Sequence, residues 1–279
     1  MLSAAQKAAY LTDGYLVLPG FRSAAQIAAV QHRAREIVDA FEPGDRTGVF
    51  SSVAPERLAD QALIESADQV HCFFEEEAFD GEGRLRVPKA LSINKIGHAL
   101  HDRDPVFDTF SRGADLADLA TDLGLLQPQI WQSMVIFKQP GIGGEVRWHQ
   151  DASFFVTEPM SVTTFWFALE DATLANGCLW AQPGGHHTPL RERFVREGDR
   201  LRMDQLDAMP WPDERSAVPL EVVAGSLVVF GGLLPHYSAP NRSPRSRMAY
   251  TLHVTDGRCE YAASNWLRRG PDLPVRGFR

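Results

Sequence analysis

Two residues separated by a single position carry the strongest chemical signal in the chain. His149 and Asp151 lie in the sequence Trp148-His149-Gln150-Asp151. On an extended segment, residues i and i+2 face the same side, so an imidazole nitrogen and a carboxylate oxygen can bind one metal ion together. Such His-x-Asp triplets also arise by chance. The pair therefore indicates a metal site only when further ligands accompany it.

A third ligand is available downstream. His236 follows the apolar run 226–230, and Ser238 lies two residues after it. Two histidines and one carboxylate form the facial triad of non-haem Fe(II) oxygenases, which leaves metal positions open for a bidentate oxo-acid and for oxygen. A lone histidine is more often a surface or capping residue. His236 is therefore a candidate because of the residue types that surround it in the sequence.

Arg247 is the residue that strengthens the case for His236. It follows eleven residues later, at the start of a predicted strand. A planar guanidinium can hold the distal carboxylate of 2-oxoglutarate through two hydrogen bonds, and Ser238 can add another. Arg242 and Arg245 are nearby alternatives, which we interpret as solvated loop charges. The ordered set of His-x-Asp, distal His and Arg predicts a site for Fe(II), 2-oxoglutarate and O2.

Composition limits the classes of partner. The chain has 279 residues, of which 44% are hydrophobic, enough to bury a substantial core, and we expect a single domain over residues 1–279. A formal charge of −8 argues against nucleic acid or an anionic membrane as a partner. Three separated cysteines show no disulfide framework. With no evident signal or spanning segment, we expect a cytoplasmic monomer that acts on a small-molecule substrate.

The first 128 residues form a mostly helical flank in this interpretation. Ser3 and Ser23 are expected to cap two helices, which are separated by an extended segment at 14–18. Residues 44–56 are typical of a loop, and a short helical stretch is expected from Pro55. Further helices are expected to begin at Asp104 and Asp115.

From residue 129 the pattern changes to short apolar or alternating runs. They lie between clusters of Gly, Pro and Asn at 130–138, 145–149, 162–169, 178–181, 219–223, 226–230 and 248–255. This spacing predicts a sandwich or barrel core over 129–257. The polar segment 187–216 is expected to be an excursion between strands, and 258–279 a C-terminal tail.

Several long segments together support a family resemblance. They include Ser-Ile-Asn-Lys-Ile-Gly-His-Ala-Leu-His at 92–101 and the segments 13–18, 132–134, 136–140, 143–146, 149–154, 170–173, 176–180 and 265–267. With these segments the chain resembles the phytanoyl-CoA dioxygenase family. The resemblance implies a mainly β fold, in which a double-stranded β-helix (jelly-roll, cupin-like) core carries N-terminal helices.

The resemblance also implies roles for particular residues. Iron would be bound by His149, Asp151 and His236, and 2-oxoglutarate by Arg247. The co-substrate site would also be lined by Lys95, Met134, Trp166 and Ser238. From residue type alone, Met134 and Trp166 would be core residues and Lys95 a surface charge. Phe165 and Phe167 are alternatives to Trp166, because the stretch after His149 is one residue shorter than in the related pattern.

The implied activity is hydroxylation of a small organic molecule with release of succinate and CO2. Two other functions stay open at this point: a cupin-like sensor without turnover, and a hydrolase or isomerase using zinc or manganese. Two other histidine pairs are weaker metal candidates. His186-His187 fits a turn better, and His98 with His101, spaced as on a helix, fits the pocket mouth better.

Overall fold

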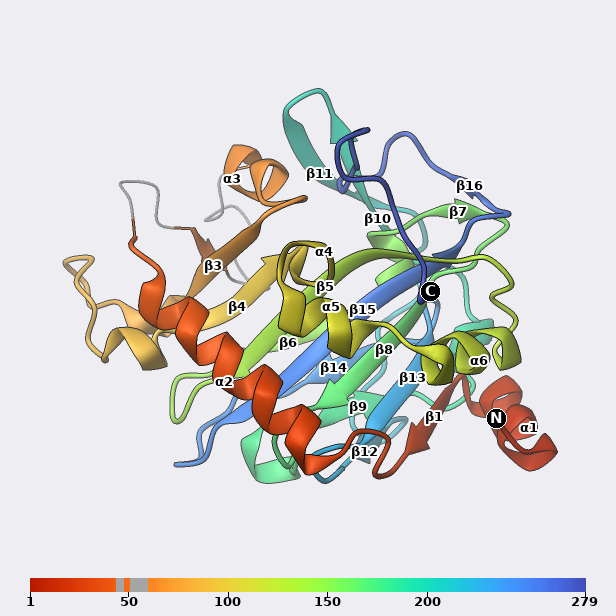
Figure 1. Cartoon of the computed structure of the whole chain (residues 1–279), viewed down its shortest axis with the longest axis horizontal. Helices are drawn as coiled ribbons and strands as arrows, with labels where there is room; N and C mark the ends of the chain where they lie inside the picture. Colours follow the sequence, from red (N-terminus) through yellow and green to blue (C-terminus); the bar gives the residue numbers. More distant parts are fainter. Residues whose placement is uncertain (44–47, 51–59) are drawn as a thin grey trace.

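The computed structural model describes residues 1–43, 48–50 and 60–279, and Figure 1 shows the whole chain. Most of the predicted loop 44–56 and the helical stretch from Pro55 lie outside the described residues. The helices are α1 (Ala4–Asp13), α2 (Ala24–Ala40), α3 (Asp60–Glu65), α4 (Leu100–Arg103), α5 (Pro105–Ser111) and α6 (Ala114–Asp122). In the described ranges, no helix has the length and apolar character needed to cross a membrane.

The two predicted N-terminal caps are confirmed. Ser3 and Ser23 each accept a hydrogen bond from the backbone N–H three residues later, and the side-chain oxygen of the glutamine at that position accepts from the backbone N–H of the cap residue. These reciprocal bonds form capping boxes, which satisfy N–H groups that a helix start leaves free. The helix predicted near Asp104 begins at Pro105, with the Asp104 carboxylate accepting from the N–H groups of Val106 and Phe107.

Two antiparallel sheets form the core of the molecule. Within the described residues, the large sheet has the order β1 (Tyr15–Leu18), β13 (Leu227–Gly231), β8 (Thr163–Ala168), β15 (Arg247–Asp256), β5 (Pro128–Lys138), β4 (Ile93–His98), β3 (Val70–Glu75) and β2 (Val49–Phe50). Among the strands in the described part of the chain, only the short β2–β3 pair is parallel. The small sheet has the order β12 (Val218–Leu220), β9 (Leu179–Ala181), β14 (His236–Ser238) and β6 (Val146–His149).

The path of the chain between these sheets defines the fold. Strands β5, β8, β13 and β15 belong to the large sheet, whereas β6, β9, β12 and β14, which fall between them in sequence, form the small one. This alternation produces a double-stranded β-helix, and the predicted jelly-roll core is confirmed. Strands β3 and β4 extend the large sheet within the segment predicted to be mostly helical, where sequence patterns indicated only β1.

The large sheet presents different residues on its two faces. Its outer face packs apolar side chains against α2, α5 and α6, and includes Phe165, Phe167, Val229, Tyr250 and Leu252. Its inner face packs against the small sheet through a second core, which includes Trp166, Val228, Ala249, Leu179 and Ala181. Because side chains alternate along a strand, each inner residue lies between two outer ones.

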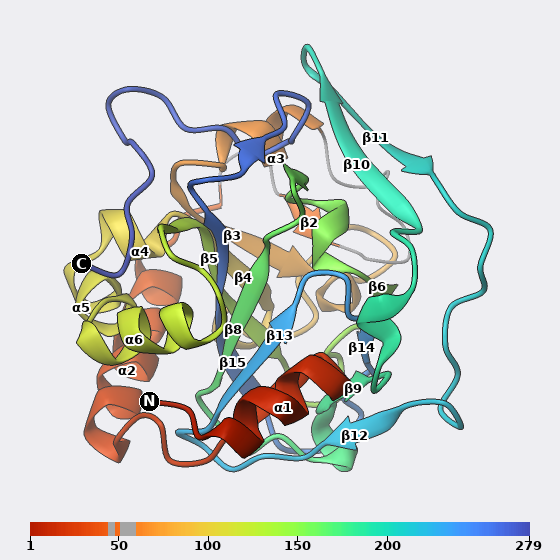
Figure 2. The ribbon, with the colours of Figure 1, turned by 90° about the vertical axis from the view of Figure 1, so that its right-hand side faces the viewer.

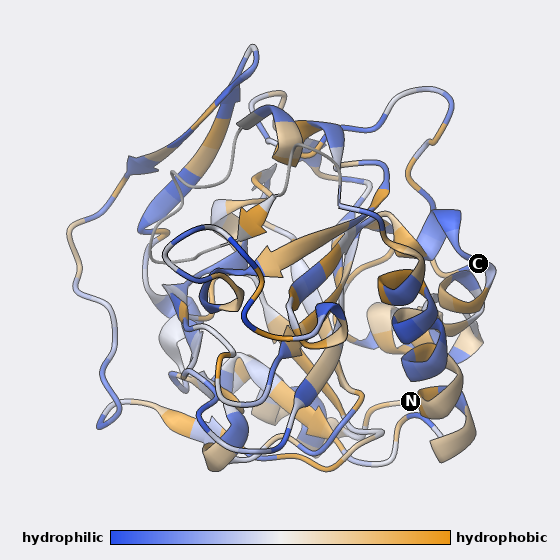
Figure 3. Ribbon diagram, turned by 90° about the vertical axis from the view of Figure 1, so that its left-hand side faces the viewer, coloured by the Kyte–Doolittle hydropathy of each residue, from blue (hydrophilic) through white to orange (hydrophobic). Residues whose placement is uncertain are grey.

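The predicted polar excursion contains a β-hairpin. Strands β10 (Glu192–Glu197) and β11 (Arg200–Gln205) pair antiparallel and extend from the body of the molecule in Figure 2. In Figure 3 the hairpin shows hydrophilic and hydrophobic residues in turn. Its apolar residues Phe194 and Leu201 join a third cluster with Phe155 and Trp266. The short strands β7 (Thr157–Glu158) and β16 (Glu260–Tyr261) pair antiparallel as a separate two-stranded sheet.

Candidate metal and co-substrate site

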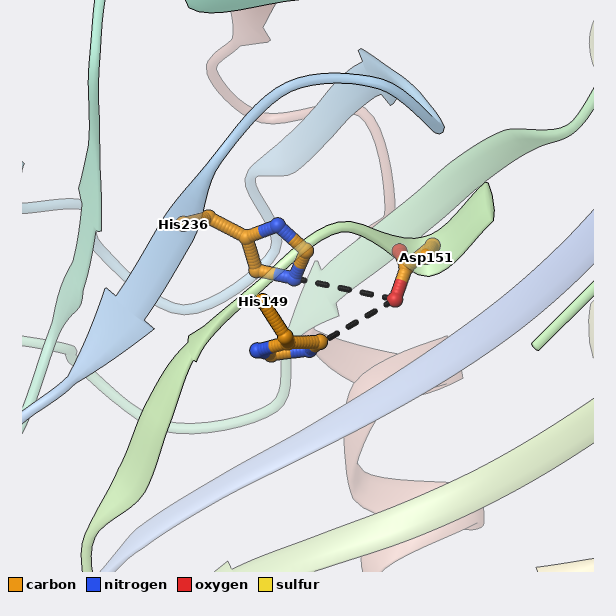
Figure 4. Close-up of side chains that lie close together, drawn as sticks. All are labelled: His149, Asp151 and His236. Atoms are coloured by element: carbon orange, nitrogen blue, oxygen red, sulfur yellow. Dashed lines mark ion pairs between the residues drawn. The ribbon is translucent and has the colours of Figure 1, made fainter. Parts of the chain in front are cut away.

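Three side chains converge at the end of the small sheet. His149 is the last residue of β6, His236 is the first of β14, and the two are register partners. Asp151 begins a 3-10 turn directly after β6 (Asp151–Ser153). Its Oδ1 lies 3.6 Å from His149 Nε2 and 3.7 Å from His236 Nε2, as Figure 4 shows. Among the described residues, the metal-ligating trio is these three, with ligand atoms within 4.8 Å of one another.

Both imidazoles are held with the same nitrogen directed at Asp151. His149 Nδ1 lies 2.8 Å from the Arg147 carbonyl oxygen, and His236 Nδ1 lies 3.0 Å from that of Leu234. A carbonyl only accepts, so each Nδ1 carries the proton and each Nε2 presents a lone pair. This is the tautomer needed for metal binding through Nε2, and here the backbone carbonyls fix it.

The second oxygen of Asp151 is held by two residues of the large sheet. Thr164 donates to Oδ2 at 2.5 Å, and His253 Nε2 lies 3.5 Å from the same oxygen. Register pairs Thr164 with His253 across β8 and β15, so one neighbouring pair orients the carboxylate. Oδ1 is thereby left directed toward the two metal-facing nitrogens.

The local environment favours the protonation states that metal binding needs. Burial alone would raise the pKa of Asp151, but the imidazoles of His236 and His253 lower it below the ordinary value. Burial, and then the neighbouring His236, lowers the pKa of His149 to about 3. At neutral pH the carboxylate is therefore ionised and His149 is neutral, which matches a divalent metal site.

Arg247 occupies the interior of the barrel at the start of β15. Its side chain is 2% exposed, and burial lowers its pKa to about 10, so it remains charged at neutral pH. Nε donates to the Gly177 carbonyl at 3.2 Å, and Nη2 lies 3.4 Å from Ser238 Oγ. Nη1 is buried and has no hydrogen-bond partner in the described part of the chain. A charged guanidinium with one open edge suits a carboxylate ligand.

The other predicted co-substrate residues lie on the same inner face. Register places Lys95 opposite Ile136, and places Met134 and Trp166 on either side of Thr251. The Trp166 ring centre lies 5.6 Å from Arg247 Cζ. Phe165 and Phe167 instead belong to the outer core. Of the three aromatic candidates, Trp166 therefore faces the interior.

Sequence reasoning missed several residues that shape this site. Thr164 and His253 orient Asp151, and Thr251 carries a buried hydroxyl whose Oγ1 has no partner within the described ranges. Lys138 is also buried, and its Nζ donates to the carbonyls of Gly144, Ser238 and Ala239. In the sequence, neither the type nor the spacing of these residues marks them as part of a site. The alternation of residues along β5, β8 and β15 would have identified them only once the strand register was known.

The weaker histidine candidates have ordinary structural partners. His186 Nε2 contacts the Leu11 carbonyl oxygen at 3.2 Å, as expected of a turn residue. His101 lies in α4 and is bound by Ser133 Oγ and the Ile130 carbonyl. His98 ends β4 instead of sharing a helix with His101. Neither pair joins a metal-ligating trio among the described residues.

Comparison with known proteins gives the family. The sequence profile of the phytanoyl-CoA dioxygenase (PhyH) family matches residues 10–249. The chain belongs to this family. Phytanoyl-CoA dioxygenase 1 of Oryza sativa subsp. japonica is 48% identical over 259 residues, which cover 92% of this chain and 90% of the relative. Phytanoyl-CoA dioxygenase domain-containing protein 1 of Bos taurus is 43% identical over 282 residues, covering 98% and 97%.

Solved structures of more distant sequence share the fold of this PhyH chain. The epimerase SnoN, solved in complex with Fe3+, alpha ketoglutarate and nogalamycin RO, superposes with a TM-score of 0.65 and 17% identity. The match covers 99% of this chain and 92% of that chain. This superposition supports the shared jelly-roll fold, whereas 17% identity says nothing of the roles of individual residues.

Proposed function

We propose that this PhyH-family chain is an Fe(II)- and 2-oxoglutarate-dependent dioxygenase that hydroxylates a small organic molecule. The observation that carries the proposal is the pairing of two features across the barrel. Nε2 of His149, Nε2 of His236 and Oδ1 of Asp151 converge on one point, and the facing sheet holds the buried, incompletely bonded guanidinium of Arg247. The donor set suits Fe(II) with three positions open.

Different residues of the chain would bind the iron and the 2-oxoglutarate. His149, Asp151 and His236 would hold iron, with Thr164 and His253 keeping the carboxylate oriented. Arg247 and Ser238 would bind the distal carboxylate of 2-oxoglutarate, whereas Lys95, Met134 and Trp166 would line the remainder of its site. When bound, iron and 2-oxoglutarate supply the oxidising chemistry, in which O2 is consumed and succinate and CO2 are released.

The names of related proteins support the same reading. The curated relatives are called dioxygenases, and the SnoN structure contains both Fe3+ and alpha ketoglutarate. The residues present here fit those two groups, because both histidines carry the metal-binding tautomer and Arg247 offers an open N–H edge.

Anaerobic reconstitution tests the proposal directly. Fe(II) and 2-oxoglutarate are added to the protein, the visible charge-transfer band of the chelate is sought, and O2 is then admitted while succinate is quantified. We expect the band and then succinate. A band without succinate, even across a substrate panel, would favour a sensor. Absence of the band would contradict the proposal and favour a hydrolase or isomerase, which metal analysis would then test.

A further inference from the structure

Thr251 has a buried hydroxyl group that is not satisfied by any group in the described part of the chain. The residue is 3% exposed, and its Oγ1 has no hydrogen-bond partner there. Nearby hydroxyls differ in this respect. Thr164 Oγ1, on the neighbouring strand β8, donates to Asp151, and Thr255 Oγ1, further along β15, accepts from Trp131 Nε1. Since a buried hydroxyl without a partner costs free energy, Thr251 is the one left for a ligand.

The position of Thr251 on β15 places it beside the metal trio. The register of residues 247–253 with β5 is continuous, so Arg247, Thr251 and His253 point to the same face of the large sheet. His253 Nε2 lies 3.5 Å from Asp151 Oδ2. At about 3.4 Å per residue, the Cα atom of Thr251 is about 7 Å from that of His253 and about 14 Å from that of Arg247. Thr251 is thus the inner-face neighbour of the residue that contacts the metal-ligating carboxylate.

Two large side chains of the proposed co-substrate site flank Thr251 across the sheet. Its register partners are Met134 on β5 and Trp166 on β8. The Trp166 ring centre also lies 5.6 Å from Arg247 Cζ, so the same ring borders both the hydroxyl and the guanidinium. In such buried surroundings a hydrogen bond is electrostatically stronger than in water. A carboxylate oxygen, which only accepts, would satisfy the hydroxyl donor.

We propose that Thr251 donates a hydrogen bond to the C1 carboxylate of 2-oxoglutarate, at the end that chelates the metal. The inference rests on the proposed function, because it adds a binding residue to the co-substrate site of that function. Arg247 and Ser238 serve the distal carboxylate, whereas Thr251 lies next to His253 and so serves the opposite end. A C1 carboxylate that binds the metal through one oxygen keeps its second oxygen free to accept from Thr251.

Thr251→Val tests the proposal, because it removes the hydroxyl and keeps the shape of the side chain. Anaerobic titration of the charge-transfer band with Fe(II) measures affinity without turnover. We expect the Kd for 2-oxoglutarate to rise about tenfold, as the loss of one hydrogen bond to a charged group predicts. The Kd for 2-oxovalerate, in which a methyl group replaces the distal carboxylate, should rise about tenfold as well. Arg247→Met should weaken the binding of 2-oxoglutarate only.

Two further variants distinguish the hydrogen bond from a general packing effect. Thr251→Ser retains the hydroxyl and should bind both 2-oxo acids with an affinity close to that of the wild type. Thr255→Val makes the same substitution on the same strand but removes the partner of Trp131 Nε1. It should lower the urea midpoint of unfolding and leave both Kd values unchanged. Thr251→Val should not lower the midpoint of the ligand-free protein, because its hydroxyl has no partner among the described residues.

The outcomes separate this inference from the proposed function. If wild-type protein lacks the band, the proposed function fails. If the band forms and Thr251→Val binds 2-oxoglutarate as tightly as the wild type, the role of Thr251 is overturned. A loss with 2-oxoglutarate that is absent with 2-oxovalerate would place the hydrogen bond at the distal carboxylate and overturn the C1 assignment. A lower Fe(II) affinity of Thr251→Val in a chelator competition without 2-oxo acid would show that Thr251 acts through His253, which would also overturn the proposal.

Discussion

Replacement of Arg247 by methionine separates co-substrate binding from metal binding. The guanidinium lies on the large sheet, whereas the ligand trio belongs to the end of the small sheet. Methionine has a similar reach and no charge, so it should leave the shape of the barrel interior largely intact. We expect Fe(II) binding to persist and 2-oxoglutarate binding to weaken sharply.

The size of the loss follows from the hydrogen bonds available. Arg247 has an unpartnered Nη1 and a long 3.4 Å contact from Nη2 to Ser238 Oγ, so both can turn to a carboxylate. Two charge-assisted bonds are worth about 3 kcal/mol at the low end of the usual range. Since about 1.4 kcal/mol corresponds to tenfold, the Kd for 2-oxoglutarate should rise by about 100-fold or more.

The same change should cost the ligand-free protein little stability. Arg247 is buried with one N–H edge unbonded, and Ser238 Oγ still donates to the Gly177 carbonyl at 2.9 Å after Arg247 is removed. We therefore expect the free energy of unfolding to change by within about 1 kcal/mol. Anaerobic titration of the charge-transfer band measures affinity, and urea unfolding without ligands measures stability.

Arg22→Met is a matched control for a buried arginine. Arg22 is 5% exposed and binds Asp115 and the Phe110 carbonyl on the helical side of the large sheet. Its loss should lower stability, because it leaves Asp115 without its partner, and it should leave 2-oxoglutarate affinity unchanged. Equal affinity in wild type and Arg247→Met would refute the role assigned to Arg247.

Three further perturbations have distinct expected results. Thr164→Val removes the hydrogen bond to Asp151, so Fe(II) affinity in a chelator competition should fall about 10- to 100-fold; an unchanged affinity would count against the orienting role. Burial lowers the pKa of Lys95 to about 7 in the folded protein, from its ordinary 10.5. Between these pH values the unfolded chain therefore binds more protons at this residue than the folded chain does. The free energy of unfolding should then rise with pH from about 7 to 10.5. In Lys95→Met, the free energy of unfolding measured in urea should change little with pH over this range. A slope equal to that of the wild type would show that other groups cause the pH dependence. Gly177→Ala should lower the unfolding free energy by about 1–2 kcal/mol or more, because φ is +83° and a Cβ would lie 2.7 Å from the Ala239 carbonyl oxygen; wild-type stability would contradict this.

Local signals allowed much of the fold to be predicted. Ser3, Ser23 and Asp104 mark helix starts through bonds to residues two or three positions away, and the residue types at such short spacing can be recognised in the sequence. The strands of the core were visible as apolar runs between turn residues. By contrast, β14 is only three residues long, and β3 and β4 gain stability from pairing across the sheet. Such non-local pairing has no short-range signature.

Some residues of the candidate site could likewise be predicted from the sequence, and others could not. His149 and Asp151 could be paired from i, i+2 spacing, and the order of His236 and Arg247 along the chain added to that signal. The orienting role of Thr164 depends on its register opposite His253, which the sequence does not state. Choosing Trp166 over its phenylalanine neighbours likewise required knowing which residues of β8 face inward. Residue type alone carries no such information.

The two sheets would bind opposite ends of 2-oxoglutarate, and their separation limits which co-substrates fit. Two of the metal ligands are on β14 and β6 of the small sheet, whereas Arg247 begins β15 of the large sheet. The thickness of the packed layer between the sheets therefore sets the length of dicarboxylic acid that reaches from metal to guanidinium. Ala249, fully buried in that layer, keeps the sheets close. Enlarging this residue should shift the preference from 2-oxoglutarate toward its homologue longer by one methylene, 2-oxoadipate.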